Sequence, residues 1–383
     1  MFSNNQKISM RQTFRLFFFD FMGIGSLIIP PFLAKGAGAD GIWCILIGGI
    51  MGFGYLFLLN RAERAMGVGL NIYLQTRTKK WLRKSFSIWL MIHSILVAGF
   101  CTYVFSLLMK KYLVQEEGYW LIAALILLIS AYAVFGGIES RARVYEVLFW
   151  FVVLPLLGML LWAVKDVDLE WMNSLFEAKT LPVFRGSYLV FLFFSVAFYL
   201  LFFPEYVEKK DGKTSLTRVV ASAMGMAWIL LLSIFWILQG CFGNRALAQM
   251  DFPVITLMST IPMAGDFLKR LDALMLAVWF FSLYAVLNLH LFYSVQMAGQ
   301  LLPMKKEGKS IRFCSVIIYG VALLFEGGQS GMRNGFFGYI WFVGAPILVL
   351  VPLWIVVGRR KNNGKKMVGN SSDSHDYSER MQG

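Results

Sequence analysis

The sequence predicts an all-α integral membrane protein with ten transmembrane helices, arranged as two inverted repeats of five. Three observations support this fold class. The chain is 58% hydrophobic and only 15% charged, its apolar residues fall into ten long runs, and glycines interrupt the first run at its middle. A mean hydropathy of +0.64 is too high for a soluble protein of 383 residues.

The ten spans are predicted from window hydropathy, because an apolar helix needs roughly 20 residues to cross a bilayer core. They are Thr13–Leu33, Gly41–Arg61, Phe86–Met109, Tyr119–Phe135, Val144–Val164, Ser187–Pro204, Leu216–Gly240, Asp272–Met297, Ile311–Phe325 and Phe336–Val357. Residues 1–358 thus form one permease-like domain, with repeat one at about 13–164 and repeat two at about 187–357. Residues 359–383 are basic and then rich in Asn and Ser, which predicts a disordered cytoplasmic tail.

The orientation follows from the Lys and Arg residues between the spans. With the N-terminus in the cytoplasm, the cytoplasmic segments carry 26 of the 36 basic residues, Arg141 and Arg143 among them. This distribution obeys the positive-inside rule and places both termini in the cytoplasm. The net charge of +14 is therefore explained by orientation in a lipid bilayer, and we expect no nucleic-acid partner.

The first span is predicted to be a broken helix. Gly23, Gly25 and Ser26 lie at mid-depth in Thr13–Leu33, and Pro30–Pro31 follow near its far end. Unpaired backbone groups are costly in lipid, so a break survives only where it lines a cavity or packs in protein. Secondary transporters bind small charged solutes at such breaks near the membrane midplane.

A break here places backbone charge where a small ligand would bind. The ligand's carboxylate would lie on the amides of Gly25, Ser26 and Leu27, and an ammonium or cation near the carbonyls of Phe21 and Met22. The alternative is that the two glycines only allow close helix packing, as we expect for the glycine pair of the second span, Gly48 and Gly52.

The counterpart of the first span in an inverted repeat is the sixth, Ser187–Pro204. Its only small residues at mid-depth are Ser195 and Ala197, which makes it the candidate for a second break and for the other wall of the site. Tyr199 in the same span is a candidate to pack on the ligand, although any one ring in so aromatic a chain also fits a core position.

Asp20 is the strongest single candidate for a functional residue. A carboxylate three residues before the break is costly in the membrane, so it is a candidate counter-charge for a ligand amine or a proton carrier. The alternative is a buried salt bridge to Arg15 or to another helix. His93 and the pair Asn288 and His290 could line the same cavity, or serve as ordinary packing residues.

Glu146 and Arg15 are candidates for a cytoplasmic gate, and the alternative for Glu146 is a local pair with Arg143. No nucleotide-binding loop, catalytic pair or metal-ligand spacing is visible in the sequence. We therefore expect neither an enzyme nor a cofactor nor a metal site.

Four segments carry a resemblance that spans nearly the whole chain except the tail. They are KISMRQ at Lys7–Gln12, GIGSLIIPPFLAKGAGADGIW at Gly23–Trp43, GGIESRARVYEVL at Gly136–Leu148 and FPVITLMSTIPMAGDFLKRLDALMLAVW at Phe252–Trp279. The chain resembles the endospore germination permease family, the B-type subunits of nutrient germinant receptors, within the amino acid/polyamine/organocation permease superfamily.

This resemblance implies a leucine-transporter-type fold in the inner membrane of a bacterial spore. It also implies a small germinant, usually an amino acid, as ligand, and an A-type membrane subunit and a C-type lipoprotein as partners. Two functions remain open. One is a receptor subunit whose ligand shifts a conformational equilibrium that the partner subunits read. The other is an amino-acid/cation secondary transporter with alternating access around the same site.

Overall fold

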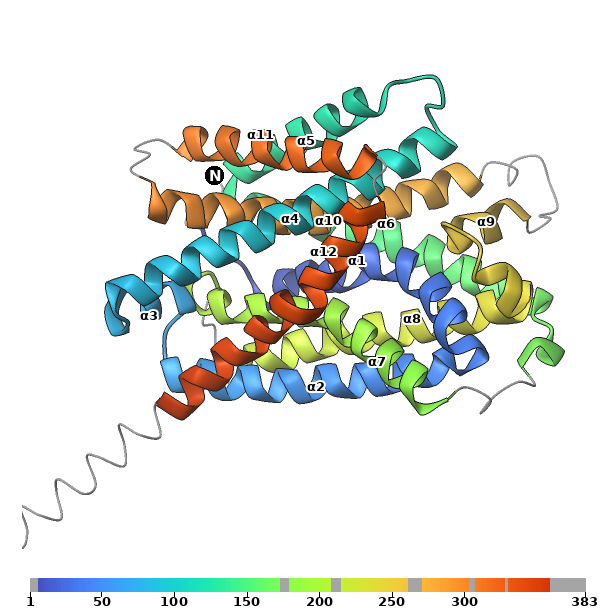
Figure 1. Ribbon diagram of the computed structural model, residues 1–383, viewed down its shortest axis with the longest axis horizontal. Coiled ribbons are helices and arrows are strands. Elements are labelled where there is room, and N and C mark those ends of the chain that lie inside the picture. Colours follow the sequence, from blue (N-terminus) through green and yellow to red (C-terminus); the bar gives the residue numbers. More distant parts are fainter. Residues whose placement is uncertain are drawn as a thin grey trace, which may run out of the picture.

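The computed structural model consists of helices joined by short connections (Figure 1). It describes residues 6–172, 179–207, 215–260, 271–302, 307–327 and 330–358. Within these ranges no strand forms, and the only strand-like pairing is an isolated parallel bridge between Ile8 and Val207. The expected tail, 359–383, lies outside the described residues.

The first half of the chain contains six α-helices. They are α1 (Met10–Ala37), α2 (Gly41–Met66), α3 (Leu70–Arg77), α4 (Lys80–Tyr112), α5 (Tyr119–Phe135) and α6 (Gly137–Ala163), with the short 3-10 helices η1 (Gly38–Asp40), η2 (Val164–Asp166) and η3 (Leu169–Met172).

The second half begins with α7 (Thr180–Phe194), which continues as the 3-10 helix η4 (Ser195–Glu205). After these come α8 (Leu216–Leu247), α9 (Pro253–Thr260), α10 (Leu271–Leu301) and α11 (Glu307–Glu326). The last helix begins as α12 (Ser330–Tyr339), passes through a π-helical turn, η6 (Ile340–Gly344), and ends at Gly358.

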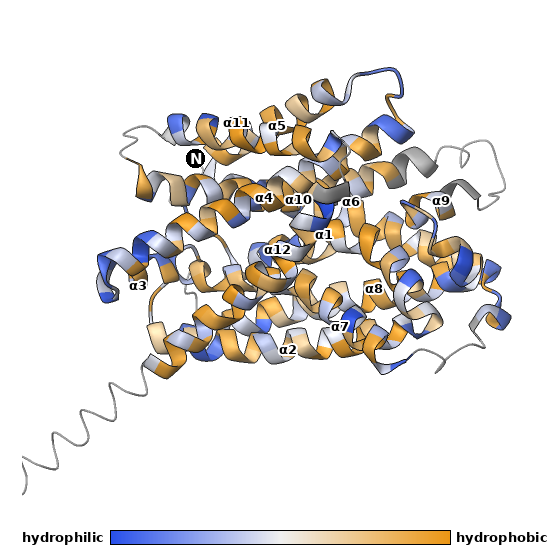
Figure 2. Cartoon of the chain, in the orientation of Figure 1, coloured by the Kyte–Doolittle hydropathy of each residue, from blue (hydrophilic) through white to orange (hydrophobic). Residues whose placement is uncertain are grey.

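Eight segments of the described chain are long and apolar enough to cross a membrane. This finding confirms the expectation of an all-α membrane protein. The count is eight rather than ten because α1, η1 and α2 run on as one segment, Met10–Met66, and α5 has only 17 residues. Polar residues gather toward the helix ends, and apolar residues cover the helices between them (Figure 2).

Helix α1 begins at a capping box and bends at a single glycine. The Ser9 hydroxyl accepts from the Gln12 amide, and the Gln12 side chain accepts from the Ser9 amide. At Gly23 the backbone leaves helical geometry (φ −32°, ψ −117°). A Cβ at this position would lie 2.0 Å from a Val286 methyl group on α10, so only glycine allows this approach. The helix resumes after the bend and runs through Pro30 and Pro31 to Ala37.

The helices pack in two groups that lie in the lower and upper parts of Figure 1. In one group α1 packs on α8 and α2 packs on α7, while in the other α4 packs on both α10 and α11. Helix α1 also contacts α10 and thereby joins the groups. Gly48 of α2 serves close packing, because a Cβ at this position would lie 2.6 Å from the Ser187 carbonyl oxygen of α7.

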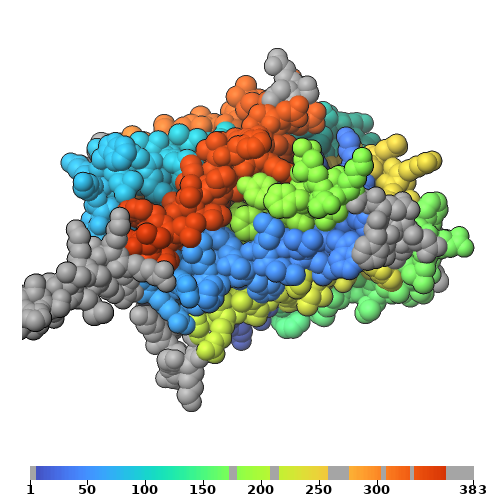
Figure 3. All heavy atoms as spheres, turned by 60° about the horizontal axis from the view of Figure 1, so that its bottom comes forward, coloured from blue at the N-terminus to red at the C-terminus, as the bar shows by residue number. Residues whose placement is uncertain are grey.

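The last helix lies on the surface beside α2 and α7 (Figure 3). Two tyrosine hydroxyls attach it: Tyr188 of α7 donates to the Trp341 carbonyl and Tyr55 of α2 to the Leu348 carbonyl, both at 2.8 Å. The first of these bonds reaches the π-helical turn, a distortion that is common at functional sites. The last helix also reaches the other helix group, because the Tyr339 hydroxyl lies 3.3 Å from His93 Nδ1 on α4. It therefore covers the space between the two helix groups.

Candidate functional site

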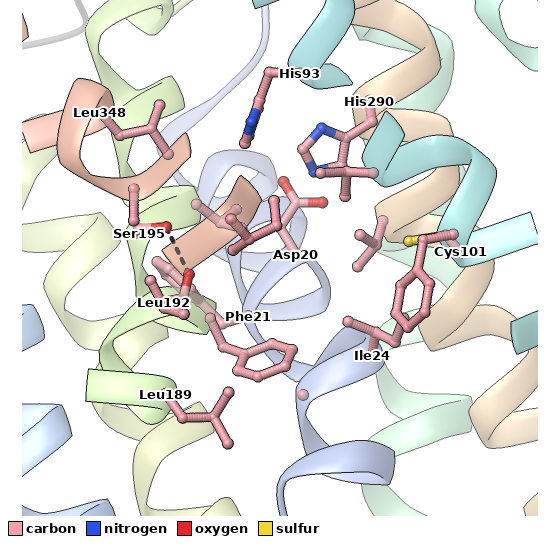
Figure 4. A pocket seen from close by; sticks show the side chains of 18 of the residues that line it. Asp20, Phe21, Ile24, His93, Cys101, Leu189, Leu192, Ser195, His290 and Leu348 are labelled. Atoms are coloured by element: carbon pink, nitrogen blue, oxygen red, sulfur yellow. Dashed lines mark hydrogen bonds between the residues drawn. The ribbon is translucent and has the colours of Figure 1, made fainter. Parts of the chain in front are cut away.

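A cavity of about 100 Å³ lies at the bend of α1 and is also lined by α4, α7, η4, α10 and the last helix (Figure 4). Its wall is mainly apolar and aromatic, with a few polar side chains facing the same space. The lining residues include Asp20, Phe21, Ile24, Gly25, His93, Phe100, Cys101, Phe193, Ser195, Tyr199, Val286, His290, Phe336 and Phe337. A concave apolar pocket with few polar groups is typical of a small-molecule site.

Asp20 is paired on one side and open on the other. Its Oδ1 atom accepts from Nη2 of Arg141, and only 1% of the Asp20 side chain is exposed. The other carboxylate oxygen, Oδ2, has no hydrogen-bond partner. The alternative of a salt bridge to another helix is thus realised through α6 and not through Arg15. Asp20 nevertheless lines the cavity, so one oxygen remains for a ligand.

Sequence reasoning missed Arg141, which was counted among the cytoplasmic loop charges. Its placement in a loop was wrong, because α6 begins at Gly137 and the Arg141 side chain is only 2% exposed. A signal was present in the sequence: Arg141 and Arg143 lie two residues apart, so about 200° apart around a helix. Arg143 accordingly points outward and pairs with Glu139, while Arg141 points toward Asp20.

Two histidines and their partners form another polar part of the cavity wall. The rings of His93 on α4 and His290 on α10 lie 6.1 Å apart between centroids. His93 Nδ1 lies 3.3 Å from the hydroxyl of Tyr339 at the end of α12. His290 Nδ1 lies 3.1 Å from the Tyr199 hydroxyl, which is also 3.3 Å from Ser94 Oγ. Hydrogen bonds at the cavity wall thus connect α4 with α12, and η4 with both α4 and α10.

The remaining candidates on α1 do not all reach the cavity. Gly25 lines it, whereas Met22 and Ser26 line a smaller space of about 10 Å³ on the other side of the helix. The Ser26 hydroxyl donates to the carbonyl of Met22 at 2.5 Å and to that of Gly23 at 3.1 Å. The side chain of Leu27 is fully buried in the hydrophobic core.

In the second half of the chain, Ser195 and Tyr199 line the cavity but Asn288 is not among its lining residues. Ser195 begins η4, and its hydroxyl donates to the Leu192 carbonyl at 2.5 Å. The change from α-helix to 3-10 helix at this residue is the irregularity that the sixth span contains. Asn288 donates to the Ser130 carbonyl on α5 at 3.3 Å, while His290, two residues further on, faces the cavity.

The two gate candidates are in contact near the start of α1. Arg15 donates to the Glu146 carbonyl at 2.9 Å, and its Nη1 lies 3.4 Å from Glu146 Oε1. Arg11 also pairs with this carboxylate, and Gln12 donates to it at 2.9 Å. The local ion pair that Arg143 forms is with Glu139, four residues before it on α6. Glu146 instead ties the first turns of α1 to α6.

The cavity offers a carboxylate oxygen, imidazoles and hydroxyls among aromatic rings, and these groups can hydrogen-bond to a small polar molecule. Within the described ranges, no group of three or more His, Cys, Asp or Glu side chains could hold a metal ion. The cavity therefore suits a small molecule with one polar end that meets Asp20.

The comparisons with known proteins point to one family. A family model described as spore germination protein matches residues 7–329. Spore germination protein A2 of Bacillus subtilis (strain 168) is 21% identical over 350 residues, which cover 89% of this chain and 93% of that protein. Spore germination protein YndE of the same strain is 20% identical over 315 residues, covering 82% and 85%.

Spore germination protein B2, also of Bacillus subtilis (strain 168), is 21% identical over 283 residues, covering 73% of this chain and 75% of that protein. These matches confirm the resemblance that the sequence segments carry. Because the family model spans most of the chain, from before α1 to beyond α11, this chain belongs to the spore germination protein family.

Proposed function

We propose that this chain is the membrane subunit of a nutrient germinant receptor, and that it binds a small amino-acid-like germinant in the cavity at the bend of α1. The observation that carries the proposal is the unpartnered Oδ2 atom of Asp20, a buried carboxylate oxygen at a cavity in a spore germination protein. An acidic side chain within a membrane-spanning helix is a functional candidate by default.

The cavity favours a particular pose for the ligand. Its ammonium group would meet Asp20 Oδ2, and its apolar part would lie against aromatic rings such as Phe193 and Phe337. The cavity has a volume of about 100 Å³, which favours a small molecule. Met22, Ser26 and Leu27 would then support the bend rather than touch the ligand.

The packing of the helices supports the proposed inverted repeats and ten spans. In the proposed repeats, α1 corresponds to α7 with η4, α2 to α8, α4 to α10 and α5 to α11. A two-fold rotation between the repeats would then superimpose the pair α1 and α8 on the pair α7 and α2. It would likewise superimpose the pair α4 and α11 on the pair α10 and α5. All four pairs are packed against each other, as a two-fold relation between repeats in the leucine-transporter-type fold requires.

The receptor role needs a ligand that distinguishes two conformations. The cavity lies between the two helix groups, so closing around a ligand would move one group against the other. The contacts of Glu146 with Arg11 and Arg15 would act as the cytoplasmic gate of this motion. An A-type membrane subunit and a C-type lipoprotein in the spore inner membrane would read it, with both termini of this chain in the cytoplasm.

The test is substitution of Asp20 in a spore-forming host whose own copy of this gene is deleted. Asp20→Asn removes the negative charge, and we expect the spores to lose their germination response to single amino acids. Asp166→Asn, the same chemical change at an exposed position on η2, is the matched control. Immunoblots of spore membranes establish that each variant is present.

Two results would decide against the proposal. An unaltered amino-acid dose response in the Asp20→Asn spores would refute the role of the cavity. Amino-acid uptake into membrane vesicles, measured alongside, separates receptor from transporter. If deletion of the gene abolishes uptake while germination stays normal, the chain is a secondary transporter.

A further inference from the structure

Arg141 is buried behind Asp20 and does not itself line the cavity. Its Nη2 atom donates to Asp20 Oδ1 and also reaches the Ala285 carbonyl of α10 at 3.3 Å. The guanidinium lies 5.5 Å from the centroid of the Tyr145 ring. These contacts of a single guanidinium nitrogen and the ring join α1, α6 and α10.

The net charge of the site is set by the ion pair between Asp20 and Arg141. Among the described residues that line the cavity, Asp20 is the only Asp or Glu, and none is a Lys or Arg. The other titratable side chains that line the cavity include His93, His290 and Tyr199, whose neutral forms add no charge. With Arg141 directly behind Asp20, the pair carries no net charge toward the cavity.

We propose that Arg141 is a specificity-determining residue that sets the net charge of the ligand at zero. This inference rests on the proposed function of the cavity. A zwitterionic amino acid adds no net charge to the buried site, whereas an amine without a carboxylate adds an uncompensated positive charge near Arg141. Charges interact strongly in a poorly solvated interior, so the site favours the zwitterion. Without Arg141, Asp20 alone would favour the cation.

A purely structural role for Arg141 makes a different prediction, because it affects all ligands equally. The experiment therefore measures a preference rather than an affinity. Purified protein in lipid nanodiscs is titrated with alanine, valine and leucine, and with the matching amino alcohols, which are cations. The corresponding des-amino carboxylic acids serve as anions. Thermal stabilisation by each compound gives the ratio of affinities.

Wild type and Arg141→Lys, which keeps the positive charge, should favour the amino acid over its amino alcohol. Arg141→Gln should shift this ratio by about tenfold or more toward the amino alcohol. The double variant Asp20→Asn/Arg141→Gln restores neutrality and should lose the shift. An unchanged ratio in Arg141→Gln would overturn the inference.

A further variant covers the case in which Arg141→Gln does not fold. Asp20→Asn leaves Arg141 uncompensated, so its preference should move about tenfold or more toward the des-amino acid. If Asp20→Asn shows no such move, the inference is refuted. A wild-type protein that none of these compounds stabilises would instead refute the proposed function, which is a distinct outcome.

Discussion

The packing of α2 against α7 gives a prediction that can be worked from the structure. Gly48→Ala adds a Cβ that would lie 2.6 Å from the Ser187 carbonyl oxygen and 2.6 Å from Val190 Cβ. Both neighbours are fixed by the backbone of α7, so no side-chain rotation relieves the contact. Helix α7 must move away from α2.

The expected cost follows from two opposing effects. Overpacking of this kind costs about 1–3 kcal/mol, while replacing Gly by Ala within a helix gains about 1 kcal/mol. Gly48→Ala should therefore be neutral to about 2 kcal/mol destabilising. Gly54→Ala on the same helix is the matched control, because nothing lies within 4 Å of a Cβ there. This control should gain the helix propensity alone.

The assay is thermal unfolding of both variants in the same detergent, followed by fluorescence-detected size-exclusion chromatography. Gly48→Ala should have a lower melting temperature than Gly54→Ala. Because α7 leads into η4, its displacement should also weaken the germination response through Ser195 and Tyr199. Equal melting temperatures of the two variants would refute the account of close packing.

Two further predictions concern the gate and the last helix. Glu146→Gln weakens the ties between α6 and the start of α1, and we expect germination without ligand to increase, measured as spontaneous loss of refractility. The protein should lose about 1–3 kcal/mol of stability, since the Glu146 carboxylate is only 24% exposed and loses charge-assisted hydrogen bonds, and Arg143→Gln should leave the spontaneous rate at the wild-type level. Tyr339→Phe removes the hydroxyl that meets the α4 histidine, so the ligand concentration for half-maximal germination should rise several-fold. Tyr319→Phe, a distant tyrosine on α11, is its control, and equal dose responses of the two variants would contradict the role of the last helix as a cover.

Much of the fold was predictable because the membrane restricts the choice of structures. Long apolar runs must be helices, since backbone groups in lipid have to be paired within the segment. The bend lies at Gly23, within the predicted break at Gly23–Ser26, and Asp20 lies in the cavity wall. Both residues stand out in the sequence, since glycines and an acid are conspicuous in an apolar run. The exact lining was not predictable: Asn288 and His290 lie two residues apart, about 200° around the helix, and hydropathy does not reveal which one faces inward.

The sequence by itself determined that the chain is helical and built for a membrane, where α1 bends, and which acid lies beside the bend, because these features depend on local composition and backbone freedom. The tertiary structure alone decided that Arg141 meets Asp20, and that the histidines of α4 and α10 face one cavity under the last helix. Asp20 and Arg141 are separated by 121 residues. Only packing of α1 against α6 and α10 brings such charges together, and the energy of a buried pair depends on that packing.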